Sequence, residues 1–90
     1  MTAEEQKTGA SLLALVALRW TLEDEARASR FLALTGLTPE GLRERLAESS
    51  IQSAVLSFLE AHEPDLLACA AALDVNPGAL VDAHRELDRG

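Results

Sequence analysis

The chain has 90 residues, a length that fits one domain, and a formal net charge of −7 at pH 7. Fifteen acidic residues against eight basic ones disfavour generic attraction to DNA, RNA or anionic lipid. Apolar residues make up 48% of the chain and aromatic residues only 3%, so a core of closely packed Leu, Val, Ile and Ala is expected, which favours helices over sheets. A single cysteine, Cys69, excludes an internal disulfide and is typical of a reducing compartment, so we expect a cytoplasmic protein.

Residues 1–9 are expected to form a flexible N-terminal segment, and residues 10–88 a single helical domain. The first predicted helix contains the longest apolar run, LLALVAL at 12–18, which is far shorter than the roughly 18 residues needed to span a bilayer. Glu4 and Glu5 precede this run and no A-x-A-like cleavage site follows it, so we do not interpret it as a signal peptide. Because the run is apolar on every side, its helix is either central in the fold or buried against a second protein.

Two helices begin with the same local pattern, GLTPEGL at 36–42 and DVNPGAL at 74–80. Thr38 and Asn76 are suited to the N-cap, and the Pro that follows each of them is suited to the first helical position. Gly36 is well placed to end the preceding helix in the left-handed conformation. Together with the periodicity of the apolar residues, these signals predict six helices, over residues 10–22, 25–35, 39–48, 50–61, 64–73 and 77–88.

The spacing in the sequence between the segments GLTPEGL and DVNPGAL suggests two weakly similar three-helix units. Sliding residues 11–48 onto 49–86 aligns Trp20 with Phe58 and places the two helix-starting prolines together. Two units are too few for a solenoid, which usually needs three or more repeats. We therefore predict an all-α fold, a compact bundle of five to six short helices.

Four residues with metal-binding or catalytic side chains, His62, Asp65, Cys69 and His84, are candidates for a chemical site. No pair of them has the spacing of a zinc finger or knuckle, and Leu66 stands where a zincin helix needs its second His. We interpret His62 and Asp65 as charges at a helix N-terminus, Cys69 as a small core residue and His84 as half-buried with its tip in water. The sequence also has no Gly-rich phosphate loop and no marked nucleophile turn. We expect a non-enzymatic protein without a metal or cofactor.

The segment FLALTGLTPEGLRERL at 31–46 has the outline of a helix-turn-helix, whose second helix enters the DNA major groove. Leu32 stands where that motif usually has a small residue. The presumed recognition helix carries three glutamates beside Arg43 and Arg45, so it has no net positive charge for phosphate contacts. A nucleic-acid-binding regulator is therefore the alternative hypothesis.

The leading hypothesis is a non-enzymatic protein–protein interaction module, with self-association through the helix over 10–22 as one form of it. Trp20 lies near the end of this apolar helix, where it serves as a core residue or as an interface anchor. Arg43 and Arg45 mark a second candidate interaction surface. We expect a protein partner or a second copy of the chain, and neither nucleic acid nor a membrane.

With RFLALTGLTPEGLRERL at 30–46 and AVLSFLEAHEPDLLACAAALDVNPGALVDAHREL at 54–87, the chain resembles domain-of-unknown-function family 3572, small helical proteins of alphaproteobacteria. The similarity spans residues 10–88, and its most specific part is FLALTGL followed by the Pro-started helix. The resemblance implies an all-α fold and a bacterial cytoplasmic protein. It implies no activity, because the family has no assigned function, and no functional residue is carried over.

Overall fold

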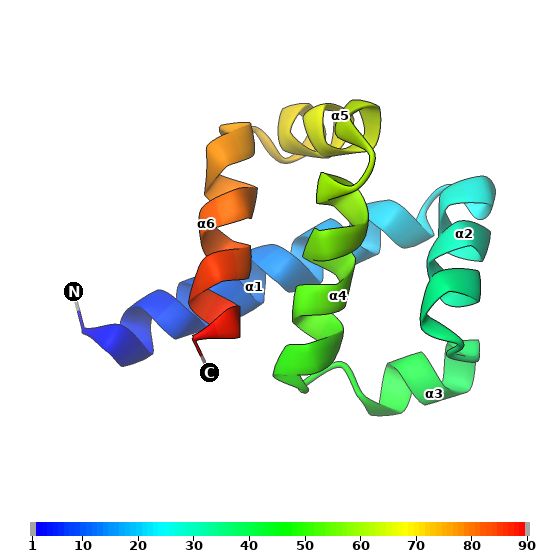
Figure 1. Ribbon diagram of the computed structural model, residues 1–90, viewed down its shortest axis with the longest axis horizontal. Coiled ribbons are helices and arrows are strands. Elements are labelled where there is room, and N and C mark those ends of the chain that lie inside the picture. Colours follow the sequence, from blue (N-terminus) through cyan, green and yellow to red (C-terminus); the bar gives the residue numbers. More distant parts are fainter. Residues whose placement is uncertain (1, 90) are drawn as a thin grey trace.

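A computed structural model describes residues 2–89 and confirms the all-α prediction, with six helices and no strand in that range (Figure 1). Met1 and Gly90 lie outside the described residues. The helices are α1 (Ala3–Leu22), α2 (Glu25–Thr35), α3 (Pro39–Glu44), α4 (Ser49–Glu60), α5 (Glu63–Leu73) and α6 (Pro77–Asp88).

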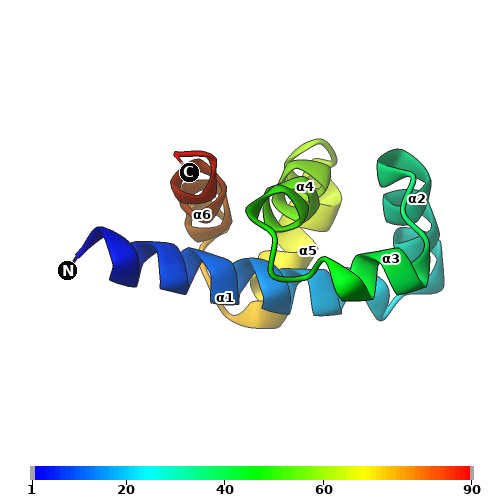
Figure 2. The same cartoon turned by 90° about the horizontal axis from the view of Figure 1, so that it is seen from below.

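The longest helix, α1, is the base on which the other helices are arranged. Helices α4 and α6 cross the same side of α1, and α6 packs most extensively against α1 and α4 (Figures 1 and 2). Helix α5 joins α4 to α6 along one side of the molecule, at the top of Figure 1, and α2 and α3 form an arm at the right-hand end. Phe31 of α2 meets Phe58 of α4 edge to face, with ring centroids 5.5 Å apart, which ties this arm to the core.

The local helix signals in the sequence are confirmed in the structure. The Thr38 side chain accepts a hydrogen bond from the Gly41 N–H at 3.0 Å, and the Asn76 side chain accepts one from the Gly78 N–H at 2.8 Å. Each bond satisfies a backbone donor that has no partner inside the helix. Gly36 ends α2 with φ 73°, the left-handed conformation that costs glycine little.

Helix α1 begins at Ala3, earlier than the predicted start at residue 10, so residues 3–9, expected to be flexible, are helical. Thr2 caps this helix by accepting a hydrogen bond from the Glu5 N–H at 3.2 Å. Glu4 and Glu5 lie in the first turn, where acidic side chains interact favourably with the helix dipole. These cap signals are local, and the early start follows from them.

Helix α3 ends at Glu44, so the prediction of a helix over 39–48 is wrong at its C-terminal end. Arg45 departs from helical dihedral angles, with φ −112° and ψ 14°, and a short turn then leads to α4. This turn brings Leu46 to lie partly buried against the core. The predicted boundaries of the other helices agree with the structure to within one residue.

The two predicted three-helix units interleave, because α4 and α6 of the second unit both cross α1 of the first (Figure 2). Their third helices differ in role: α6 packs against α1 and α4, whereas α3 lies at the edge of the molecule (Figure 1). Across residues 2–89, no single helix is long and apolar enough to cross a membrane. Within the same residues, α5 and α6 together are long and apolar enough, but the two helices are bent by 102° relative to each other.

Candidate docking groove on α1

Helix α1 is central in the fold, which was one of the two alternatives expected from its sequence, but its apolar run is not wholly buried. On the side that faces α4 and α6 it buries small and apolar side chains, whereas on the opposite side Leu12 is 60% exposed, Val16 48% and Leu22 40%. Figure 2 shows α4 and α6 above α1, with α3 beside it and much of the opposite side of α1 uncovered. The buried residues of α1 are Ala10, Ala14, Ala17, Leu18 and Thr21.

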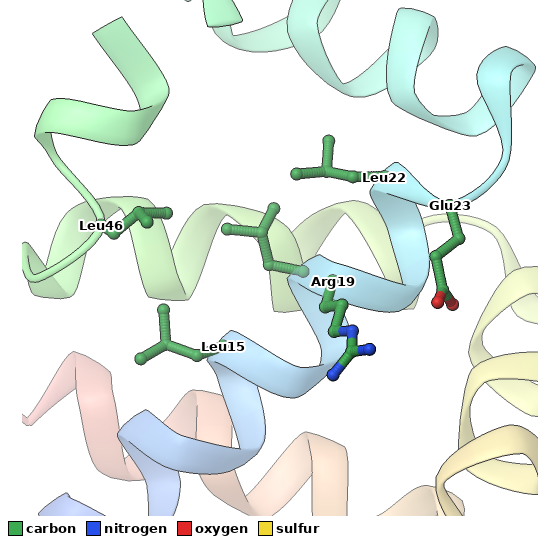
Figure 3. A pocket seen from close by; sticks show the side chains of 6 residues that line it. Leu15, Arg19, Leu22, Glu23 and Leu46 are labelled. Atoms are coloured by element: carbon green, nitrogen blue, oxygen red, sulfur yellow. The ribbon is translucent and has the colours of Figure 1, made fainter. Parts of the chain in front are cut away.

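A groove of about 530 Å³ lies between the C-terminal half of α1 and the turn that follows α3. Figure 3 shows Leu15, Leu22 and Leu46 pointing into it, while Arg19 and Glu23 project on the side away from Leu46. A second hollow of about 140 Å³ shares Leu22 and Leu46 with the first, so the two form one continuous surface. We call this surface the α1 groove; it is lined by Leu15, Leu18, Arg19, Leu22, Glu23, Leu32, Pro39, Leu42, Arg43 and Leu46.

A buried glutamine holds one wall of the α1 groove in place. Gln52 of α4 is only 4% exposed, and its amide nitrogen donates a hydrogen bond to the Leu46 carbonyl at 3.0 Å. Its amide oxygen accepts a hydrogen bond from the Ser11 hydroxyl of α1. A buried amide without partners is costly, so these two bonds make the position of the Leu46 turn dependent on Gln52.

The arginines around the groove differ from the others in their pairing. Within residues 2–89, Arg19 and Arg43 form no ion pair, side-chain hydrogen bond or contact with an aromatic ring. The guanidinium of Arg27 lies 3.6 Å from the Trp20 ring centroid. Each remaining arginine pairs with a carboxylate: Arg30 with Asp65, Arg45 with Glu48, Arg85 with Asp82 and Arg89 with Glu86.

The three site residues proposed from the sequence do not form one surface. Trp20 packs partly buried against the core and lines a hollow of about 210 Å³ towards α5, which shares Arg19 and Glu23 with the α1 groove but faces the other side of these two residues. Arg43 lines the α1 groove, whereas Arg45 is engaged with Glu48 at 3.0 Å. Two lining residues were not proposed as site residues from the sequence: Leu22, which lies on one helix face with Leu12 and Leu15, and Leu46, which is four residues from Leu42 and marks an apolar stripe with it.

His62, Asp65 and Arg30 form a cluster of polar contacts at the start of α5. One oxygen of Asp65 lies 2.9 Å from His62 Nδ1 and 2.8 Å from Arg30 on α2. Burial alone would raise the pKa of Asp65, but the hydrogen bonds from Arg30 and His62 and the positive charge near them outweigh it and lower that pKa. The cluster therefore links α2 to α5 through a carboxylate that stays ionised.

In the described part of the chain, neither His84 nor Cys69 forms a hydrogen bond or ion pair with this cluster, although Cys69 follows Asp65 by four residues on α5. The His84 ring is placed between Glu60 of α4 and Asp88, whose carboxylate is 3.3 Å from Nε2. Its side chain is 22% exposed, so the prediction that it is only partly buried is confirmed. Cys69 is fully buried, and this burial raises the pKa of its thiol to about 11. No three His, Cys, Asp or Glu side chains within residues 2–89 form a group that could hold a metal ion.

Comparison with known proteins gives a family but no described relative. Searches of curated proteins and of solved structures found no match. A family model described as "Protein of unknown function (DUF3572)" matches residues 7–90, nearly the whole chain, and this agrees with the resemblance noted in the sequence. The chain therefore belongs to the family described as Protein of unknown function (DUF3572).

Proposed function

We propose that this protein is a non-enzymatic interaction module that receives a helix of a partner protein in the α1 groove. One observation carries the proposal: an open groove of about 530 Å³ is lined mainly by leucines, and one of them, Leu22, is 40% exposed. Isolated exposed apolar residues are ordinary on protein surfaces, but a contiguous apolar surface with a polar rim is typical of interaction sites.

The exposed side chains supply a useful driving force for binding. Fully burying a Leu side chain contributes about 1.5–3 kcal/mol, so burying the exposed 40% of Leu22 contributes about 1 kcal/mol. The partly exposed Leu15 and Leu46 line the same groove and would add to this contribution. The complementary surface of the partner would add a similar amount. The total must exceed the loss of rotational and translational freedom on association, so we expect a modest affinity, in the micromolar range.

The shape of the surface favours a helix as the occupant. One face of α1 carries residues at spacings of three, four and three, which is the pattern by which two helices pack along each other. These residues are Leu12, Leu15, Arg19 and Leu22. No strand lies within residues 2–89, so pairing of a partner strand with a sheet edge has no template there. A partner helix lying along α1 would contact both the leucines of α1 and Leu46.

The test compares two exposed leucines, one in the groove and one outside it. Tagged wild type, Leu22→Ser and Leu34→Ser serve as baits in nuclease-treated lysate, with quantitative mass spectrometry. Leu34 is 74% exposed on α2 and does not line the groove, so its substitution controls for lost surface hydrophobicity. We expect one protein to be retained by wild type and Leu34→Ser, to be depleted about tenfold by Leu22→Ser, and to bind purified wild type directly. Equal recovery by all three baits, or recovery of the bait alone, would refute the proposal.

Self-association through α1 is the second candidate, because the exposed leucines of one copy could pack on those of another. Antiparallel pairing centred on this stripe would bring the two Arg19 side chains close together, and each copy carries a net charge of −7. We therefore rank it below a heterologous partner. Sedimentation velocity over a wide concentration range decides the matter: a dimer abolished by Leu22→Ser and retained by Leu34→Ser would replace the partner helix with a second copy.

A helix-turn-helix regulator keeps little support. Helix α3 has six residues, and Glu40 and Glu44 offset the charge of Arg43. Arg45, at its C-terminal end, pairs with Glu48 rather than projecting freely. Titration with random duplex DNA at low salt tests this alternative, and binding that is weakened by Arg43→Ala would revive it.

A further inference from the structure

We infer that the helix received by the α1 groove is acidic along its edges, with carboxylates that pair with Arg19 and Arg43. The inference rests on the proposed function, because it specifies the chemistry of the helix that binds in the groove. It follows from where the arginines without partners lie in the fold.

Arg19 and Arg43 stand on different walls of the groove, one on α1 and the other on α3. They are also the two arginines that make no charged, hydrogen-bonded or aromatic contact within residues 2–89. Leu22 and Leu46 lie between the hollows that these arginines line. A helix with its apolar face on those leucines would therefore present its flanking side chains to both arginines.

Three features of the chain oppose an acidic partner. Glu40 and Glu44 lie near Arg43 on α3 and offset its charge in part, although neither of them lines the groove. Glu23 does line the groove, and it stands four residues after Arg19 as the C-cap residue of α1. The net charge of −7 repels an acidic partner at long range. Charges beyond about 8 Å are largely screened at physiological ionic strength, so the local arginines decide the preference once the helix is in contact. Neutralising Glu23 should accordingly strengthen binding of an acidic helix.

The opposition between local and overall charge makes the inference testable with two peptides. The first is a dye-labelled synthetic helix of about 18 residues, long enough to be partly helical in water, with leucines along one face and glutamates on both sides of that face. The second has lysine in place of every glutamate. Fluorescence anisotropy at physiological ionic strength measures binding of both to wild type, Leu22→Ser and Leu34→Ser, and to Arg19→Glu/Arg43→Glu. An Arg85→Glu/Arg89→Glu variant has the same net charge as the last of these and keeps the groove arginines, so it is the matched control.

Wild type is expected to bind the glutamate peptide about fivefold more tightly than the lysine peptide, the change expected from two exposed ion pairs. Arg19→Glu/Arg43→Glu should invert this order, Arg85→Glu/Arg89→Glu should preserve it, and Glu23→Gln should enlarge it. A lysine peptide that binds wild type more tightly, with Leu22→Ser still weakening it, would overturn the acidic partner and leave the groove intact. Loss of dependence on Leu22 for both peptides would instead overturn the groove itself. A concentration-dependent dimer blocked by Leu22→Ser would replace the acidic helix with a second copy.

Discussion

Replacing Gln52 by Met keeps the size of a buried side chain and removes both of its hydrogen bonds, to the Leu46 carbonyl and to the Ser11 hydroxyl. Each such bond contributes about 0.5–1.5 kcal/mol net, so the free energy of unfolding should fall by about 2 kcal/mol. For a chain of 90 residues the whole free energy of unfolding is about 5–13 kcal/mol, which makes this loss large enough to measure. The substitution should also release the turn that carries Leu46, because Gln52 is its buried anchor.

Urea denaturation followed by circular dichroism measures the stability loss, and limited trypsin digestion follows the turn. Arg45 lies at the start of that turn, so Gln52→Met should speed cleavage after Arg45 relative to the rest of the chain. Ser53→Ala on the same helix is the control; it removes an exposed hydrogen bond to Asp88 and should change stability by less than about 0.5 kcal/mol. Wild-type stability and wild-type cleavage in Gln52→Met would refute the view that this glutamine holds the wall of the groove.

Three further outcomes follow from single positions. Because the pKa of Asp65 is lowered in the folded protein, the pairing of its carboxylate stabilises the fold above about pH 4, and this contribution is lost as the pH falls through the lowered pKa. The Asp65→Asn variant should therefore be less stable than wild type at pH 7 and should lose less stability on acidification. Thermal melts at a series of pH values measure both effects. Because burial raises the pKa of Cys69 to about 11, a thiol reagent at pH 8 should react with the folded protein no faster than the chain opens; rapid complete labelling would contradict this. Gly36→Ala should lower the free energy of unfolding by about 1 kcal/mol, because Gly36 has φ 73° and alanine is strained there. Gly9 lies inside α1 with open space around it, so Gly9→Ala should raise the free energy of unfolding by about 0.5–1 kcal/mol. Chemical denaturation of the two variants distinguishes these opposite signs.

Features that depend on neighbouring residues could be predicted from the sequence. The caps at Thr38 and Asn76 and the left-handed Gly36 act within a few residues, and the structure has all three. The early start of α1 has a local cause as well, since Thr2 caps it, and the prediction erred by giving that signal too little weight. Local chemistry of this kind is repeated in any fold that contains the segment, which is why it is predictable.

Features that depend on tertiary contacts could not be predicted. The continuation of α3 to residue 48 looked favourable locally, but the chain turns after Glu44 and Leu46 packs against the core, where Gln52 of another helix holds it. The contact between His84 and Glu60 likewise joins α6 to α4, and the periodicity of the apolar residues does not report a contact between two separate helices. The candidate groove is of this second kind, because Leu22 and Leu46 meet only in the folded chain.

The measurement that tests the central claim most directly is site-specific photo-crosslinking, with benzoylphenylalanine placed at position 22 in one preparation and at position 34 in another. Both positions are exposed, and only Leu22 lines the α1 groove, so the two probes sample the same lysate from different surfaces. The docking account predicts one crosslinked partner from position 22, competed away by excess untagged wild type and absent from position 34. The same adducts from both positions, or none from position 22, would contradict it.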